Sequence, residues 1–469
     1  MVFNLKRRYY QFFAIQEIES SPVLQLLFYA LSLSFFITFF GWVEKNFISI
    51  STYQNGLHVC PPYFPSCGEY LFLESLPYGY SQSAFYLLLF LALSYGVYAA
   101  YRKDWTSAHV VILSCLIWKV IVGFFFTYGL TGNFDYYDMA LAFVWLFMRE
   151  KEYFAKITFV FLYVLASSIK IDGGWIFANY FNSLFTGAPL FNHAILPFFT
   201  NIVIVMQMVG SWFLLSNRRL LQTAALTYFL LFHIYSGIIV NYRYIAISIP
   251  ALFILFSQQG HFHIKRITRN TLLGYLFLLF LLAGQLTGIL IPGDQKKTLE
   301  GNYYGMYMFE ANHQCFSKAT VYSTGNTEPI VLARENHVAN NRCDPYRYWF
   351  PLKTKCMRDD SVARISWTFD HSINGEKYER IVDVEDVCVL EYRPFAHNEW
   401  IRTDNAQVLD TPIFKNGFAY DISPQIKVSP DLIKNEKLLE NLVSGYWLLW
   451  ILSILGACSA VLYATFKRQ

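Results

Sequence analysis

The sequence predicts a polytopic α-helical membrane protein of about ten spans, with both termini cytoplasmic and a disulfide-braced, mostly β exoplasmic domain before the last span. Three observations support this fold class. The 469 residues are 55% hydrophobic and only 15% charged, with a mean hydropathy of +0.31, which is too apolar for an ordinary soluble enzyme. Hydrophobic segments of spanning length recur along the chain. Most of the cysteines lie in segments that the same pattern assigns to one side.

Residues 1–21 are predicted to form a cytoplasmic interfacial segment. This segment combines Lys6, Arg7 and Arg8 with a cluster of Tyr and Phe residues, which favours a position at a membrane surface. A cleavable signal peptide is not expected, because the first apolar segment begins near residue 22 and is as long as a full span.

Residues 22–291 are predicted to form a helical transmembrane domain, and residues 442–469 a last transmembrane helix. The expected spans are 22–43, 83–100, 107–128, 157–170, 196–215, 272–291 and 443–464, with shorter candidates at 137–148, 220–239 and 243–257. If every segment crosses, the clusters of Lys and Arg fall on one side, which the positive-inside rule makes cytoplasmic. These clusters are Lys6 to Arg8, Arg102 and Lys103, Arg149 to Lys156, Arg218 and Arg219, His261 to Arg269, and Lys467 and Arg468.

Residues 292–441 differ in composition, being charged, polar and β-branched, and are predicted to form an exoplasmic β-rich domain. Alternating runs at Arg364 to Ser372 and Val387 to Tyr392 predict strands. Cysteines on the expected outer face predict up to three disulfides. The six candidates are Cys60, Cys67, Cys315, Cys343, Cys356 and Cys388.

Cys60 and Cys67 are separated by six residues, which is not a zinc-ligand spacing, so a disulfide-closed loop is preferred there and no metal is expected. The pairing of the other four cysteines stays open.

Two further properties bear on partners and localisation. The net charge of +4 is small and forms no basic block, so the lipid bilayer is the expected partner and nucleic acid is not. No Asn-x-Ser/Thr acceptor occurs, which favours a bacterial inner membrane with the large domain in the periplasm.

A lysine at the edge of an apolar span is a site hypothesis by default, because an unpaired ammonium there is costly. Lys170 ends the apolar run that begins at Phe159, just before Asp172-Gly-Gly-Trp175. The alternative is a lysine that snorkels or pairs with Asp172. Lys119, in the third span, is either a second site or a staple paired with Asp135 or Asp138. His233 is either catalytic or a satisfied packing histidine.

Four segments, taken in order, resemble the vitamin K-dependent γ-carboxylase family and the wider group of bacterial proteins that share its horizontally transferred transmembrane (HTTM) module. They are Ile169 to Trp175, the Phe232-His233 span with the helix after it, Gly301 to His313, and Ala319 to Tyr322. The resemblance covers residues 20–325. It implies a lyase-type reaction in which reduced vitamin K or menaquinol, O2 and CO2 convert glutamates of an exported peptide or protein to γ-carboxyglutamate, without a metal.

The resemblance also implies roles for individual residues. Lys170 matches the base that deprotonates the quinol, and His313 matches a site histidine at the outer mouth. Asn133 matches an asparagine before the fourth span, where the family continues with histidine and this chain has Phe134. The quinol pocket is expected to include Asn133, Asp172, Trp175, His233 and Tyr304.

Two other functions stay open. A non-enzymatic membrane factor that binds or matures an exported peptide or protein is favoured by Phe134 and opposed by the Lys170 and His313 pair. A polyprenyl-phosphate-dependent glycosyltransferase would use acidic residues of the first outer loop, where Glu69 and Glu74 lie without a recognisable motif.

Overall fold

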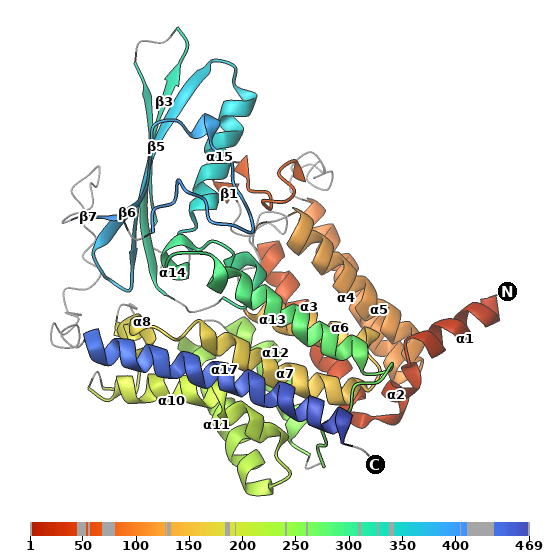
Figure 1. Ribbon diagram of the computed structural model, residues 1–469. Helices are drawn as coiled ribbons and strands as arrows, with labels where there is room; N and C mark the ends of the chain where they lie inside the picture. Colours follow the sequence, from red (N-terminus) through yellow and green to blue (C-terminus); the bar gives the residue numbers. More distant parts are fainter. Residues whose placement is uncertain are drawn as a thin grey trace.

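The computed structural model comprises a bundle of helices with an antiparallel sheet at one end (Figure 1). The residues that the structure describes are 2–44, 53–54, 57–67, 80–126, 128, 133–182, 188–192, 194–239, 242–258, 261–307, 311–325, 328–336, 342–403, 405–409 and 436–467.

Each of the hydrophobic segments singled out in the sequence is helical. The helices of this part are α1 (Val2–Phe12), α2 (Ile15–Ser20), α3 (Pro22–Glu44), α4 (Tyr80–Tyr101), α5 (Trp105–Val120), the π-helix η4 (Ile121–Phe126), α6 (Asn133–Phe147), α7 (Lys151–Ser168), α8 (Gly173–Ile176), α9 (Asn179–Asn182), α10 (Leu196–Met208), the 3-10 helix η5 (Gly210–Leu215), α11 (Arg219–Ile239), α12 (Tyr242–Phe256), α13 (Leu272–Leu290) and α17 (Glu436–Phe466). A small hairpin, β1 (Tyr53–Gln54) and β2 (Leu57–His58), follows α3.

The expected number of spans is only partly supported. By length and composition, three described helices are suited to crossing a membrane: Trp105–Phe125, Leu272–Leu290 and Lys437–Phe466. Others, such as α6, α10 and α12, are shorter than a full span. The segment 196–215 is an example, since α10 ends at Met208 and a 3-10 turn follows.

Helix α7 lies at the centre of the bundle. It contacts α6, α10, α12, α13, α17 and η5, and its side chains are buried on every face, except that Glu152 and Lys156 are half-buried. A helix that is apolar all round is stable only when neighbours cover it. The other helices therefore pack around α7, and this packing fixes the position of the residues that follow its C-terminal end.

Residues 311–409 contain what we call the sheet domain. Its five strands are β3 (His313–Ser323), β4 (Ile330–Asn336), β5 (Val362–Ile373), β6 (Tyr378–Val384) and β7 (Gln407–Leu409), in the antiparallel order β4-β3-β5-β6-β7. Its helices are α15 (Pro345–Arg358) and the 3-10 helix η7 (Val387–Val389). Two short helices, α14 (Gln295–Thr298) and η6 (Asn302–Tyr304), join α13 to this domain.

The strand predicted at Arg364 to Ser372 is confirmed within β5, and Ala319 to Tyr322 lies within β3. The strand predicted at Val387 to Tyr392 is wrong. The Asp386 carboxylate accepts a hydrogen bond from Cys388 N, which closes η7, and Cys388 is bonded to Cys356 of α15. These tertiary links outweigh the strand propensity of the sequence.

Three disulfides are present, and they use all six predicted cysteines. The pairs are Cys60 with Cys67, Cys315 with Cys343, and Cys356 with Cys388. Cys115 and Cys458 are free thiols, the first buried and the second exposed. All three disulfides lie at or near the sheet domain, because Tyr346 of α15 donates to the carbonyl of Cys60 at 2.7 Å.

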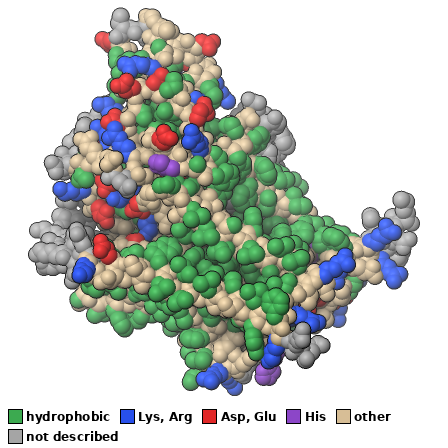
Figure 2. Space-filling model, in the orientation of Figure 1, with side chains coloured by type: hydrophobic (Ala, Val, Ile, Leu, Met, Phe, Trp, Pro, Cys, Tyr) green, Lys and Arg blue, Asp and Glu red, His purple; other side chains and the backbone are tan. Residues whose placement is uncertain are grey.

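The distribution of side chains separates the two parts of the molecule. Hydrophobic side chains cover the visible face of the helical bundle. Charged side chains of both signs gather on the sheet domain, and mainly Lys and Arg are seen at the opposite end of the bundle, where α1 lies (Figure 2). An apolar belt between two charged ends is the surface expected of a protein embedded in a bilayer.

Candidate functional site

The chain turns sharply after α7, and Asp172 shapes the turn. Its Oδ1 accepts hydrogen bonds from Gly174 N at 2.6 Å and Trp175 N at 3.3 Å, so it is the N-cap of α8. This cap reverses the chain and returns Trp175 toward Lys170, which lies two residues before the cap.

Lys170 is buried at this turn, with 3% of its surface exposed. Its Nζ donates to the carbonyl of Ala166 at 2.9 Å and lies 5.2 Å from the ring centroid of Trp175. The Trp175 ring stacks on Tyr180, with centroids 5.3 Å apart and an interplanar angle of 13°. The amine therefore lies against an aromatic ring, a contact that attracts a cation.

The sheet domain docks on the same turn. Lys296 of α14 forms an ion pair with Asp172 and is 95% buried at its side chain. Asn312, next to β3, donates to the carbonyl of Tyr180 at 2.6 Å, and its backbone N–H donates to Asn374 Oδ1 at 3.0 Å. A Cβ at Gly174 would lie 2.4 Å from Nδ2 of Asn374, so a larger residue there would force the Asn374 side chain to move.

His313 follows Asn312 and pairs with a second buried histidine, His371 of β5. The two rings stack at 5.3 Å, and His313 Nδ1 lies 3.1 Å from His371 Nε2. His371 Nδ1 lies 2.9 Å from the carbonyl of Lys297. Since a carbonyl only accepts, His371 carries its proton on Nδ1 and His313 donates from its own Nδ1. Burial lowers the pKa of His371 well below its usual range, so this imidazole is neutral.

The structure thus brings together four of the residues predicted from the sequence: Lys170, Asp172, Trp175 and His313. The alternative that Lys170 pairs with Asp172 is not supported, because Asp172 forms its ion pair with Lys296. We call this set, with Tyr180, Lys296, Asn312, His371 and Asn374, the junction cluster.

Two predicted pocket residues have their main contacts elsewhere. His233 lies inside α11, where it hydrogen-bonds to the hydroxyl of Tyr163 and stacks on its ring. Tyr304 stacks on Phe395 at 4.6 Å. Asn133 is the first residue of α6, but its side chain lies outside the described residues, as does that of Phe134.

Lys119 is a staple inside the bundle. Its Nζ lies 2.7 Å from Asp135 Oδ1 and 2.6 Å from Asp138 Oδ2, with all three side chains buried. Thr38 of α3 completes the group, since Lys119 donates to its hydroxyl at 3.1 Å and that hydroxyl donates to Asp138 at 3.2 Å. Of the two readings of Lys119, the structural one is supported.

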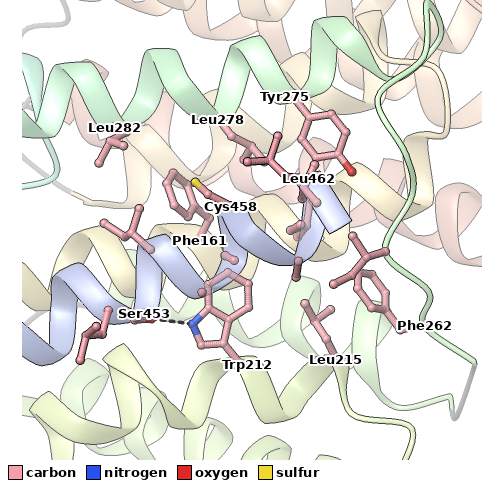
Figure 3. Close-up of a pocket in the computed structure, with 18 of the residues that line it drawn as sticks. Phe161, Trp212, Leu215, Phe262, Tyr275, Leu278, Leu282, Ser453, Cys458 and Leu462 are labelled. Carbon is pink, nitrogen blue, oxygen red and sulfur yellow. Dashed lines mark hydrogen bonds between the residues drawn. The ribbon is translucent and has the colours of Figure 1, made fainter. Parts of the chain in front are cut away.

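Three cavities formed by described residues lie away from the junction cluster. One of about 960 Å³ runs between α7, η5, α13 and α17 and is almost wholly apolar (Figure 3). A polar one of about 690 Å³ adjoins it, and a third of about 540 Å³ lies on the sheet. Within the described part of the chain, no group of three or more His, Cys, Asp or Glu side chains is arranged to hold a metal ion.

Sequence reasoning missed His371, Lys296 and Asn374. Each is distant in sequence from the end of α7, and only the docking of the sheet domain brings it there. One signal was available for His371, because it lies in the strand predicted at Arg364 to Ser372.

Comparisons with protein-family models, with curated proteins and with solved structures find no match to this chain.

Proposed function

We propose that this chain is a multi-pass membrane enzyme that resembles the vitamin K-dependent γ-carboxylases and acts on glutamates of an exported peptide or protein at the junction cluster. The observation that carries the proposal is the position of Lys170. Its amine is buried against Trp175 at the end of the central helix, where the sheet domain is clamped onto the same turn.

Several features support a multi-pass location with the sheet domain outside the cytoplasm. All ten apolar segments are helical, three described helices are both long and apolar enough to span a membrane, and the visible face of the bundle is apolar. The disulfides gather at the sheet domain, and disulfides persist in oxidising compartments such as the bacterial periplasm. The basic loops at the other end of the bundle would then face the cytoplasm.

The donors of the junction cluster suit a reduced quinone chemically, since an amine shielded from water and two stacked aromatic rings suit an aromatic diol. Lys170 and Trp175 would hold it. When bound, a quinol supplies with O2 the oxidation that drives replacement of a glutamate γ-proton by CO2, and the other products are quinone epoxide, water and a proton. The resemblance to the carboxylase family implies that the proposed reaction uses no metal.

Different residues of the protein would have different roles in the proposed reaction. Lys170 would accept a proton, and its burial would keep bulk water from competing for that proton. Asp172 cannot take this role while it caps α8 and neutralises Lys296. Instead, it fixes the turn that places Trp175 over Lys170. His313 and His371, hydrogen-bonded to each other, would form the polar wall on the side of the sheet domain.

A second candidate is a non-enzymatic factor that binds or matures an exported peptide or protein. The close packing of the junction cluster favours it, because the contacts of Asp172 and Asn312 also join the bundle to α14 and the sheet domain. Under this reading, the cluster would be only a structural joint.

Quinol turnover by the purified protein separates the two candidates without knowledge of the peptide. The native chain, Lys170→Met and the exposed-lysine control Lys103→Met would be given menaquinol and O2, and epoxide formation would be followed. The proposal expects epoxide from the native chain and the control, and a loss of about 100-fold or more for Lys170→Met. Equal rates for folded Lys170→Met and native protein would remove Lys170 from the chemistry. No epoxide from any of them would favour the second candidate.

A further inference from the structure

The apolar cavity of about 960 Å³ forms a groove along α17. One wall is α13 and the opposite wall is η5, with α7 behind (Figure 3). Only 6% of the apolar stretch of α17 and 22% of that of α13 are buried, against 47% for Trp105–Phe125. The groove therefore opens on the side of the bundle that the proposed bilayer would contact, and its volume is at the upper end of the roughly 300–1,000 Å³ usual for ligand sites.

One end of the groove reaches the basic end of the bundle. The backbone N–H of Ile267 donates to Thr465 Oγ1 at 2.9 Å, which fixes the last turn of α17 against the loop of residues 261–269. Leu215, Phe262 and Tyr275 lie near this end in Figure 3.

The polar cavity of about 690 Å³ continues from this end. Leu215 and Phe262 line both cavities. Tyr153 of the polar cavity and Tyr275 of the groove join their hydroxyls at 2.8 Å, and the Tyr153 ring stacks on Phe262 at 5.2 Å. An apolar space and a polar one thus share a wall at the level where a lipid headgroup would lie.

The polar cavity carries charges of both signs. Lys156 pairs with Glu152 at 2.7 Å, and Lys265 pairs with Glu150. These side chains keep between 18% and 44% of their surface exposed, so each pair can still meet a ligand. His261 and His263 complete the rim, whereas Glu17 is already used by the backbone N–H groups of Glu150 and Lys151.

We propose that the groove and the polar cavity together bind one zwitterionic phospholipid. An acyl chain would lie along α17, the phosphate would face Lys156 and Lys265, and the ammonium would face Glu150 and Glu152. The charges favour this lipid class, because a zwitterionic head can interact with both members of each ion pair, whereas the head of a quinone carries no charge. The inference rests on the proposed membrane location and not on the proposed chemistry.

Helix α17 supplies a matched pair of variants. Gly456 lines the groove, and Gly445 does not. A Cβ at either position would meet no atom within 4 Å, so both accept a larger side chain, and leucine changes helix propensity equally at both. Gly456→Leu fills the groove, whereas Gly445→Leu is the control.

The experiment is binding of phosphatidylethanolamine to the full chain in detergent, measured by native mass spectrometry, together with lipid analysis of the protein purified from membranes. We expect native chain and Gly445→Leu to carry one phospholipid, and Gly456→Leu to bind it about tenfold more weakly. Glu150→Gln combined with Lys265→Gln keeps the net charge and should lower the preference for phosphatidylethanolamine over phosphatidylglycerol.

Three results would overturn the inference: equal binding by Gly456→Leu, co-purification of a quinone instead of a phospholipid, or native chain that binds no phospholipid. None of these results depends on quinol turnover, so this proposal and the proposed function can fail separately.

Discussion

The carboxylate of Asp172 forms an ion pair with Lys296, and this pair joins the turn after α7 to α14 at the foot of the sheet domain. The same carboxylate caps α8 and so holds Trp175 over Lys170. One side chain thereby fixes both the shape of the candidate site and the docking of the domain that covers it.

Removing one partner of this pair is expected to cost more than removing both. Lys296→Met leaves a carboxylate in a largely buried position, which costs about 3–5 kcal/mol in comparable pairs. Adding Asp172→Asn removes the charge and keeps a capping side chain. Thermal unfolding in detergent should therefore rank native chain first, the double variant second and Lys296→Met last. A double variant less stable than Lys296→Met would contradict this account of the pair.

A similar prediction follows from the buried charges of Lys119, Asp135 and Asp138. Lys119→Met leaves Asp135 and Asp138 buried together with no cation, whereas Asp138→Asn leaves one lysine with one carboxylate. We expect Lys119→Met to be less stable than Asp138→Asn by several kcal/mol, which is what an uncompensated buried charge costs. Lys119→Met should therefore unfold at a clearly lower temperature. The reverse order would show that the ammonium is not what holds the carboxylates.

Asp344 makes the stability of the sheet domain depend on pH. It caps α15 by accepting from Tyr346 N at 2.9 Å, and Tyr128 donates to its other oxygen. Burial raises the pKa of Asp344 to about 6, above its value of about 3.9 in an unfolded chain. The folded state therefore binds the proton more readily, and this carboxyl stabilises the fold as pH falls from about 6 toward 4.

Asp344→Asn keeps the cap and removes the titration. The stability of native chain relative to this variant should rise by about 2 kcal/mol from pH 7 to pH 4. Unfolding temperatures of both proteins at the two pH values measure this difference. A difference that does not change with pH would contradict the raised pKa.

The three disulfides predict a simple thiol count. Of the eight cysteines, only Cys115 and Cys458 are free. Denatured protein should therefore take up two alkylating groups without reductant and eight after reduction, as read by intact mass. More than two without reductant would show that one of the disulfides does not form in the cell.

The sequence was sufficient where local pattern and burial agree. The ten apolar segments are all helical because their composition allows little else, and the alternation at Arg364 to Ser372 predicted β5. The six cysteines of the disulfides followed from their placement on one side, but their pairing needed the folded sheet domain.

Predictions failed where distant contacts decide the outcome. Val387 to Tyr392 has a strand pattern, but Asp386 and the bond from Cys388 to Cys356 turn it into a 3-10 helix. Lys170, Asp172 and Trp175 were found from a break in an apolar run. Lys296, His371 and Asn374 reach the same site through tertiary docking, and of these only His371 lies in an element that the sequence predicted.

The most direct test of the proposed function is a search for γ-carboxyglutamate in exported and membrane proteins of cells that carry the native chain, Lys170→Ala or Lys103→Ala. The account predicts glutamates that gain CO2 with the native chain and with Lys103→Ala, and none with Lys170→Ala. Such glutamates at equal levels with Lys170→Ala, or their absence from all three strains while the folded protein is present, would contradict it.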